Sequence, residues 1–395
     1  MPNYNSRIRK AEELMQAFAE RTGLGTSATP VRYLWTDAFA LGNCLSLARE
    51  GNDGYLELAG RLVDQVHETL GHHREDDPRK GRLSCPYQTA DADHPTRCGL
   101  RIGKPLPERG PEEAFDERLE WERDGQYFHY LSKWMHALDM LARETRKPEY
   151  AVWACDLAAT AAEAFVYQDT NGRPRMHWKM SIDLSRPLVP MMGQHDPLDG
   201  LITTLQVQHT ASVMTESESS PGPEWERLNK GVRIYSEMLQ GLELTTTDVL
   251  GLGGLLMDAT RLGRLMLQGT SSAEQLLLDV LRAAQVGLDH WAERSSMERP
   301  PEQRLAFREL GLVIGLQGIK RIGPEIFRND SAFRQFSDIR NLFETLDRHH
   351  SKGEAILSFW LEPQHRQNST WRQLQDINEV MLATALAPQG VLLWS

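Results

Sequence analysis

The chain has 395 residues, of which 40% are hydrophobic and 25% charged, as is ordinary for a globular protein. Its 44 basic and 55 acidic residues give a net charge of −11, which argues against nucleic acid or an anionic membrane as the main partner. The most apolar stretch, residues 249–257, ends at Asp258. It is far shorter than the roughly 18 residues that a membrane helix needs, so no membrane partner is expected.

The four cysteines are too few for a disulfide scaffold and include no CxxC pair. Cys44 and Cys155 fall inside helical patterns and are expected to be small core residues. The first ten residues are polar and lack the apolar core of a signal peptide. These features predict a reducing, cytoplasmic setting.

Along the chain, apolar residues recur three or four positions apart, which is the spacing of helices with one buried face. Residues 55–71 illustrate it, with Tyr55, Leu58 and Leu62 on one face and charged residues between them. Helices are predicted over residues 4–21, 37–49, 55–71, 124–145, 148–166, 197–217, 224–241, 248–268, 272–294, 304–322, 330–350 and 371–387.

These helices alternate between mostly apolar segments and more charged, amphipathic ones. An alternation of this kind predicts an all-α fold in which six helical hairpins close into a ring, with the apolar helices inside. The N-terminal ends of the inner helices would then surround one central pocket. No linker or change of composition divides the chain, so we expect a single domain over residues 1–395.

Two stretches interrupt the helical pattern. Residues 74–123 form a long segment rich in Pro, Gly and charge, and loops of this length are often functional. Residues 167–195 contain the turn Asn171-Gly172 with alternating residues after it, which predicts a short β-hairpin. Each stretch runs into the start of a buried helix. We therefore expect both to lie on the same rim of the ring and to wall the pocket.

The whole pattern resembles the six-hairpin glycosidase superfold, the (α/α)6 toroid. It is also similar in architecture to the N-acylglucosamine 2-epimerases. The segments Trp35-Thr36-Asp37 and Arg123-Asp124-Gly125-Gln126-Tyr127-Phe128 look like inner-helix openings of such toroids. In these families, acidic and aromatic residues at the openings bind and cleave sugars. The resemblance thus implies an all-α (α/α)6 toroid that acts on a small carbohydrate.

Glycoside hydrolysis needs two carboxyl groups, one protonated and one ionised. Asp37, Asp124, Asp196 and Asp199 all lie close to predicted starts of buried helices. We predict Asp124 and Asp196 as the acid/base pair, with Asp37 as the third catalytic candidate. The competing interpretation of each is a helix N-cap, a position that favours Asp.

Substrate-binding residues are predicted around these carboxylates. Tryptophan and tyrosine rings stack on the C–H faces of sugars, and cationic side chains could bind an acidic substituent. The predicted set is Trp35, Arg101, Trp121, Gln126, Tyr127, Trp178, Lys179, Asp183, His195 and Asp199.

Two other functions fit the same pattern. Histidines on opposite sides of a sugar carbon would permit epimerisation, with His195 and either His129 or His177 as the bases. A non-catalytic sugar-binding toroid is the third hypothesis. The spacing of Cys85, His94 and Cys98 fits no standard zinc motif, so neither a metal nor a cofactor is predicted. The sequence predicts no oligomeric state.

Overall fold

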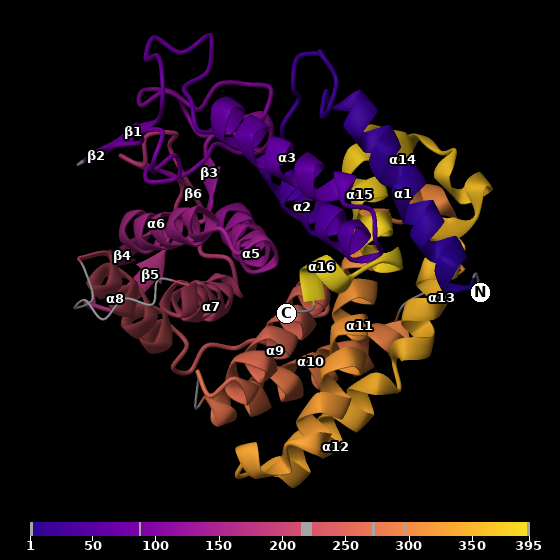
Figure 1. The fold of residues 1–395 in the computed structure, drawn as a ribbon. Coiled ribbons are helices and arrows are strands. Elements are labelled where there is room, and N and C mark those ends of the chain that lie inside the picture. The colour runs from indigo at the N-terminus through magenta and orange to yellow at the C-terminus, as the bar shows by residue number, and fades with distance from the viewer. Residues whose placement is uncertain (1–2, 87, 215–222, 271–272, 295–297, 393–395) are drawn as a thin grey trace. The chain divides into compact units, whose positions relative to one another are not determined.

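The computed structural model describes residues 3–86, 88–214, 223–270, 273–294 and 298–392, most of which are helical (Figure 1). These residues form two compact units. Unit 1 holds the described residues of 3–18, 49–51 and 243–392, and unit 2 holds those of 19–48 and 52–242. The single domain over residues 1–395 stays a prediction.

Unit 2 contains all of the predicted catalytic and substrate-binding residues. Its helices are α2 (Leu34–Arg49), α3 (Gly54–Leu70), α4 (Glu117–Glu122), α5 (Phe128–Thr145), α6 (Pro148–Ala164), α7 (Asp196–Met214) and α8 (Pro223–Met238). Helices α5 and α7 pack against each other, and α6 and α8 pack beside them (Figure 1). All residues of α2 from Leu34 to Ala48 are buried, whereas α3 buries one face, as its apolar spacing predicts.

Unit 2 also contains seven short strands among its described residues: β1 (Ser84–Cys85), β2 (Gln88–Thr89), β3 (Gln126–Tyr127), β4 (Val166–Gln168), β5 (Pro174–Met176), β6 (Lys179–Met180) and β7 (Pro187–Val189). Strand β4 pairs antiparallel with β5, so the hairpin predicted around Asn171-Gly172 is confirmed. Strand β6 lies between β3 and β7. Through β3, the second insertion is hydrogen-bonded to the segment just before α5.

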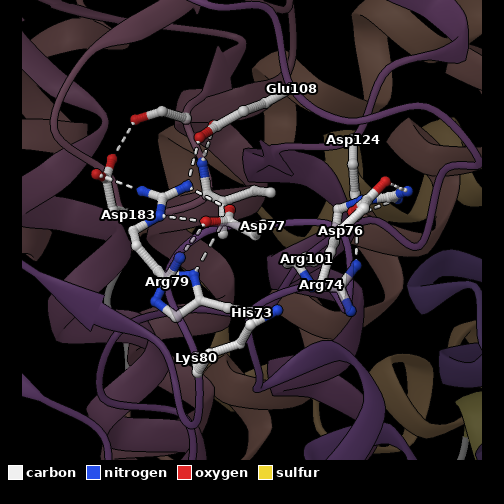
Figure 2. Close-up of polar contacts among 12 residues, drawn as sticks. His73, Arg74, Asp76, Asp77, Arg79, Lys80, Arg101, Glu108, Asp124 and Asp183 are labelled. Atoms are coloured by element: carbon white, nitrogen blue, oxygen red, sulfur yellow. Dashed lines mark hydrogen bonds and ion pairs between the residues drawn. The ribbon is translucent and has the colours of Figure 1, made fainter.

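The two insertions pack on each other. Arg79 forms a 2.7 Å ion pair with Asp183, and the Ile182 amide donates to Glu108 Oε2 over 2.6 Å (Figure 2). The first insertion also reaches the start of α2, because the Leu34 amide donates to the Ile102 carbonyl over 3.1 Å. Within unit 2, both insertions therefore border the N-terminal ends of buried helices.

Unit 1 contains most of α1 (Tyr4–Arg21), together with α9 (Val249–Leu267), α10 (Glu274–Arg294), α11 (Ala306–Arg328), α12 (Phe336–Asp347), α13 (His350–Leu361), α14 (Ser369–Gln373), α15 (Gln375–Leu386) and α16 (Gln389–Leu392). Three 3-10 turns, η1 (Pro301–Gln303), η2 (Asp330–Ala332) and η3 (Pro363–Arg366), connect some of them. The first helix joins the C-terminal helices through a 2.7 Å ion pair between Arg7 and Glu354 of α13.

Glycines let α9 and α11 approach closely. A Cβ atom on Gly253 would lie 2.3 Å from the Gly311 carbonyl oxygen, and one on Gly315 would lie 2.6 Å from the Gly253 oxygen. Larger residues would force the two helices apart. The contact offsets the roughly 1 kcal/mol by which each helical glycine disfavours the helix.

Four predicted helices differ clearly from the structure. The one predicted over residues 304–322 continues to Arg328. The helix predicted over residues 124–145 begins only at Phe128, because Gln126 and Tyr127 pair with β6. The one predicted over 330–350 is split, since residues 348–349 form a turn between α12 and α13. The last one is divided into α14 and α15. The ends predicted at residues 217 and 272 lie outside the described residues.

Two observations concern the setting of the protein. Across the described ranges, no helix is both long and apolar enough to cross a membrane. Cys85 and Cys98 form a disulfide, which the sequence did not predict, while Cys44 and Cys155 are buried free thiols, as it did.

Candidate active site

Two carboxylates lie together in the first turn of α7. Asp196 and Asp199 are only 6% and 5% exposed. Asp199 accepts hydrogen bonds from Lys133 Nζ over 2.8 Å, from Thr203 Oγ1 over 3.3 Å and from the Ser132 hydroxyl. Because Ser132 and Lys133 belong to α5, this cluster joins the two packed helices, and the lysine ammonium stabilises the ionised form of Asp199.

Asp196 has a different environment. Its carboxylate accepts a 3.2 Å hydrogen bond from the Gly193 amide. Burial, together with the nearby charge of Asp199, raises the pKa of Asp196 to about 7, and the Gly193 hydrogen bond and Lys133 oppose this rise. A substantial fraction of Asp196 is therefore protonated near neutral pH. Of two carboxyl groups three residues apart, one can thus hold a proton while the other is paired with a lysine.

His129 lies one helical turn before Lys133, the partner of Asp199, and contacts a group of aromatic side chains. Trp178 Nε1 donates to His129 Nδ1 over 3.1 Å, which leaves the histidine proton on Nε2. Burial lowers the pKa of His129 to about 3, and the charge of Lys133 adds to this effect. The ring is therefore neutral at physiological pH. His129 and Lys133 are four residues apart on α5 and lie on the same helix face.

The aromatic side chains line a pocket of about 670 Å³ within unit 2. The rings of Trp121 and Trp178 meet edge to face with centroids 5.2 Å apart, and Tyr127 lies 5.6 Å from Trp178. Phe115 and Met191 complete an apolar rim in which Trp121 remains 46% exposed. Rings that are partly exposed around a cavity can stack on an apolar face of a ligand.

Asp124 occupies a fully buried ion-paired position. It contacts Arg101 and lies 3.6 Å from Arg74, as Figure 2 shows, and it accepts 3.0 Å hydrogen bonds from the Gly103 and Gly125 amides. Its side chain is 0% exposed. These contacts tie the first insertion to the segment before α5.

Asp37 is held in a similar way. It accepts hydrogen bonds from Arg32 Nη1 over 3.2 Å and from the Tyr33 amide over 2.8 Å, and both charged side chains are buried. These contacts fold the chain back onto the start of α2. Trp35, predicted to bind substrate, is 5% exposed and packs on Phe39 with ring centroids 4.6 Å apart.

The other predicted binding residues mostly hold the insertions together. Lys179 is buried and forms a 2.9 Å ion pair with Glu120. Gln126 accepts from the Leu100 amide over 2.9 Å and donates to two backbone carbonyls. Asp183 binds Arg79, which also contacts Asp77 and Glu108 (Figure 2). His195 is partly buried directly before Asp196.

The remaining histidines lie in other environments. His177 stacks on Tyr167 with ring centroids 4.2 Å apart and lines a separate cavity of about 870 Å³. Lys133 and Ser132 were not predicted from the sequence. The sequence offers one indication of Lys133: it lies four residues after His129, a candidate base, and therefore on the same face of α5.

The pattern Cys85, His94 and Cys98 does not form a metal site, because the two cysteines are bonded to each other and His94 pairs with Asp156 over 2.6 Å. In the part of the chain that the structure describes, no group of three His, Cys, Asp or Glu residues is arranged to hold a metal ion.

No family model matches the chain, and no curated protein matches it either. Among solved structures, it is similar to a GH76 alpha-mannanase from Bacteroides thetaiotaomicron, with 8% identity and a TM-score of 0.54 over 99% of this chain and 97% of that one. A D-mannose isomerase aligns with 11% identity and a TM-score of 0.42, over 86% of this chain and 85% of that one. The chain is all-α and has the (α/α)6 fold of the six-hairpin glycosidases.

Proposed function

We propose that the protein is a carbohydrate-active enzyme that hydrolyses a glycosidic bond, with Asp196 and Asp199 as its two carboxyl groups. The observation that carries the proposal is the contrast between these neighbours. Burial and a like charge raise the pKa of Asp196 to about 7, whereas Asp199 forms a 2.8 Å ion pair with Lys133, which favours its charged form. Pairs of carboxyl groups with environments this different serve as acid and base in glycosidases.

The roles follow from the protonation states. Asp196 donates its proton to the oxygen of the departing sugar. Asp199, ionised, assists attack at the anomeric carbon, either by activating water or by bonding to the sugar. This assignment replaces Asp124 with Asp199, because Asp124 is fully buried against Arg101. It also leaves Asp37, paired with Arg32, outside the chemistry.

The aromatic pocket suits a small carbohydrate. Trp121 and Trp178 present rings that can stack on sugar C–H faces, and the buried Tyr127 packs beside them. His129, whose proton stays on Nε2, is suited to donate a hydrogen bond to a sugar hydroxyl oxygen. Since a protein of the same fold is an alpha-mannanase, mannose-containing oligosaccharides are the first substrates to try.

The test is a screen of oligosaccharides and aryl glycosides, with products separated by chromatography. We expect cleavage by the unmodified protein, and a loss of about 10²–10⁴-fold in turnover for Asp196→Asn, as is typical when acid/base assistance is removed. The matched control is Asp64→Asn, an exposed carboxylate on α3, which should leave turnover unchanged.

Two other outcomes would replace the proposal. Interconversion of sugar isomers without bond cleavage, lost in His195→Gln, would establish the epimerase. Sugar binding with no product of either kind would establish a binding protein. The low pKa of His129 makes it a weak base, which is the reason for preferring hydrolysis over epimerisation.

The cytoplasmic setting is a separate prediction. The Cys85–Cys98 disulfide weighs against it, because disulfides persist mainly in oxidising compartments. Fractionation of the producing cells, with alkylation of free thiols before and after reduction, would assign both the compartment and the state of the bond.

A further inference from the structure

A third cavity lies within unit 1, at the C-terminal end of α10 and the N-terminal ends of α9 and α11. Its volume is about 340 Å³. Four arginines line it, namely Arg294, Arg299, Arg304 and Arg308, against two acidic residues. In a chain with a net charge of −11, such a concentration of positive charge within one cavity requires an explanation.

Arg304 forms a fixed wall of this cavity. It is 4% exposed and binds Glu309 with Nε at 2.9 Å and Nη2 at 2.7 Å. Its guanidinium stacks on Phe359, 3.8 Å from the ring centroid. Trp360 Nε1 also donates to Glu309 over 2.7 Å. Glu309 is therefore fully engaged and does not neutralise the other arginines.

The second acidic residue is engaged as well. Asp248 Oδ1 accepts from the Gly251 amide over 2.8 Å and so caps α9. Its other oxygen accepts from Arg308 over 2.6 Å. Each acidic group of the cavity is thus paired with one arginine, Glu309 with Arg304 and Asp248 with Arg308.

Arg294 and Arg299 differ from this pair. Among the described residues, neither has a carboxylate within ion-pair distance. Arg294 lies in the last turn of α10, where the helix dipole favours a cation, but the dipole offers no counter-ion. The cavity therefore carries two positive charges beyond those its own acids balance.

We propose that this cavity binds a small organic anion through a carboxylate or phosphate group held by Arg294 and Arg299. A guanidinium presents two parallel donors that match either group. Trp291, which also lines the cavity and is 8% exposed, offers an apolar surface for the body of the ligand. The proposal does not depend on the carboxylate pair of unit 2.

Titration calorimetry at low ionic strength tests it, with inorganic phosphate, glucuronate and glucose as probes. We expect both anions to bind and glucose not to bind. Binding of phosphate alone would assign a phosphate site, and binding of glucuronate alone a carboxylate site. The double variant Arg294→Gln/Arg299→Gln should weaken binding at least about tenfold, because hydrogen bonds to charged groups are worth about 1.5–3 kcal/mol each.

Arg282→Gln is the matched control, since Arg282 is an exposed arginine on the same helix, α10. It should bind the anions as the unmodified protein does. The proposal is overturned if neither anion binds, if the double variant binds as well as the control, or if glucose binds as tightly as glucuronate. These binding measurements do not depend on catalysis, so a failure of the hydrolase proposal would leave them unaffected.

Discussion

Lys133 Nζ lies 2.8 Å from Asp199 Oδ2, across the contact between α5 and α7. The lysine side chain is 19% exposed and the aspartate 7%. This ion pair lies next to a carboxyl group, that of Asp196, whose pKa is raised to about 7. Lys133 thus pairs directly with Asp199, and its charge also opposes, in a minor way, the burial that raises the pKa of Asp196.

Replacing Lys133 should therefore alter the pH dependence of turnover as well as its size. In Lys133→Met, Asp199 loses its counter-ion and is harder to ionise, so the acidic limb of the rate profile should shift to higher pH. The measurement is kcat/KM against pH on a cleaved oligosaccharide. Lys147→Gln, an exposed lysine before α6, is the control and should keep the original profile. An unshifted limb in Lys133→Met would exclude this role.

Asp196 should make stability depend on pH. Its pKa is raised to about 7 in the folded protein, above the value of about 3.9 in an unfolded chain. A raised pKa means that the contribution of this group to stability is fully present below about pH 4 and is lost as the pH rises towards 7 and beyond. Asp196→Asn, which stays neutral, should gain stability relative to the unmodified protein over that window.

The expected gain is on the order of a few kcal/mol at alkaline pH and close to zero at acidic pH. Urea unfolding of both proteins at several pH values measures it. The same pKa predicts that hydrolysis declines above about pH 7, where Asp196 loses the proton it must donate. If the difference in stability did not change with pH, the pKa of Asp196 would not be raised in the folded protein.

Much of the fold could be predicted from the sequence, because helices leave a local signal. The spacing of Tyr55, Leu58 and Leu62 predicts a buried face of α3, on which Tyr55 and Leu62 are indeed buried, and the turn Asn171-Gly172 predicts the β4–β5 hairpin. Each of these signals lies within a few residues of the structure that it predicts.

The site could be predicted only in part, because its contacts join distant segments. Asp196 and Asp199 were candidates on position alone, but Lys133, the partner of Asp199, lies 66 residues before it. Asp124 matched the expected position and yet pairs with Arg101, 23 residues earlier. No local pattern distinguishes an aspartate that faces a substrate from one that faces an arginine. The Cys85–Cys98 bond was missed for a related reason, since a spacing does not reveal a pairing.

The hydrogen bond from Trp178 to His129 should fix the tautomer of the histidine. In Trp178→Phe, the 3.1 Å bond to Nδ1 is lost while the aromatic ring is kept. We expect a mixture of tautomers, visible in the ¹⁵N shifts of His129 by NMR, and weaker sugar binding by about 1 kcal/mol, the usual net value of one hydrogen bond. Trp121→Phe keeps the bond and should leave the His129 shifts unchanged.

Reduction of the Cys85–Cys98 disulfide should destabilise unit 2. The bond joins residues 13 apart, and closing a loop of this size contributes about 2–4 kcal/mol. Thermal unfolding with and without a reductant measures the loss, which Cys85→Ser/Cys98→Ser should reproduce. Cys44→Ala leaves the bond intact and is the control, so its response to the reductant should equal that of the unmodified protein.

Asp124→Asn should lower the stability of the fold, whereas Asp196→Asn should lower turnover and leave the fold intact. Removing the charge of Asp124 leaves Arg101 buried at 7% exposure without its counter-ion, and breaking a buried pair costs about 3–5 kcal/mol. Asp196→Asn keeps the shape of the side chain and removes an acid whose burial disfavours its charge, so the fold should remain intact while turnover is lost. Thermal unfolding and turnover of both variants, measured at neutral pH, distinguish the two roles. If Asp124→Asn unfolded at the temperature of the unmodified protein and were inactive, Asp124 would return to the catalytic pair.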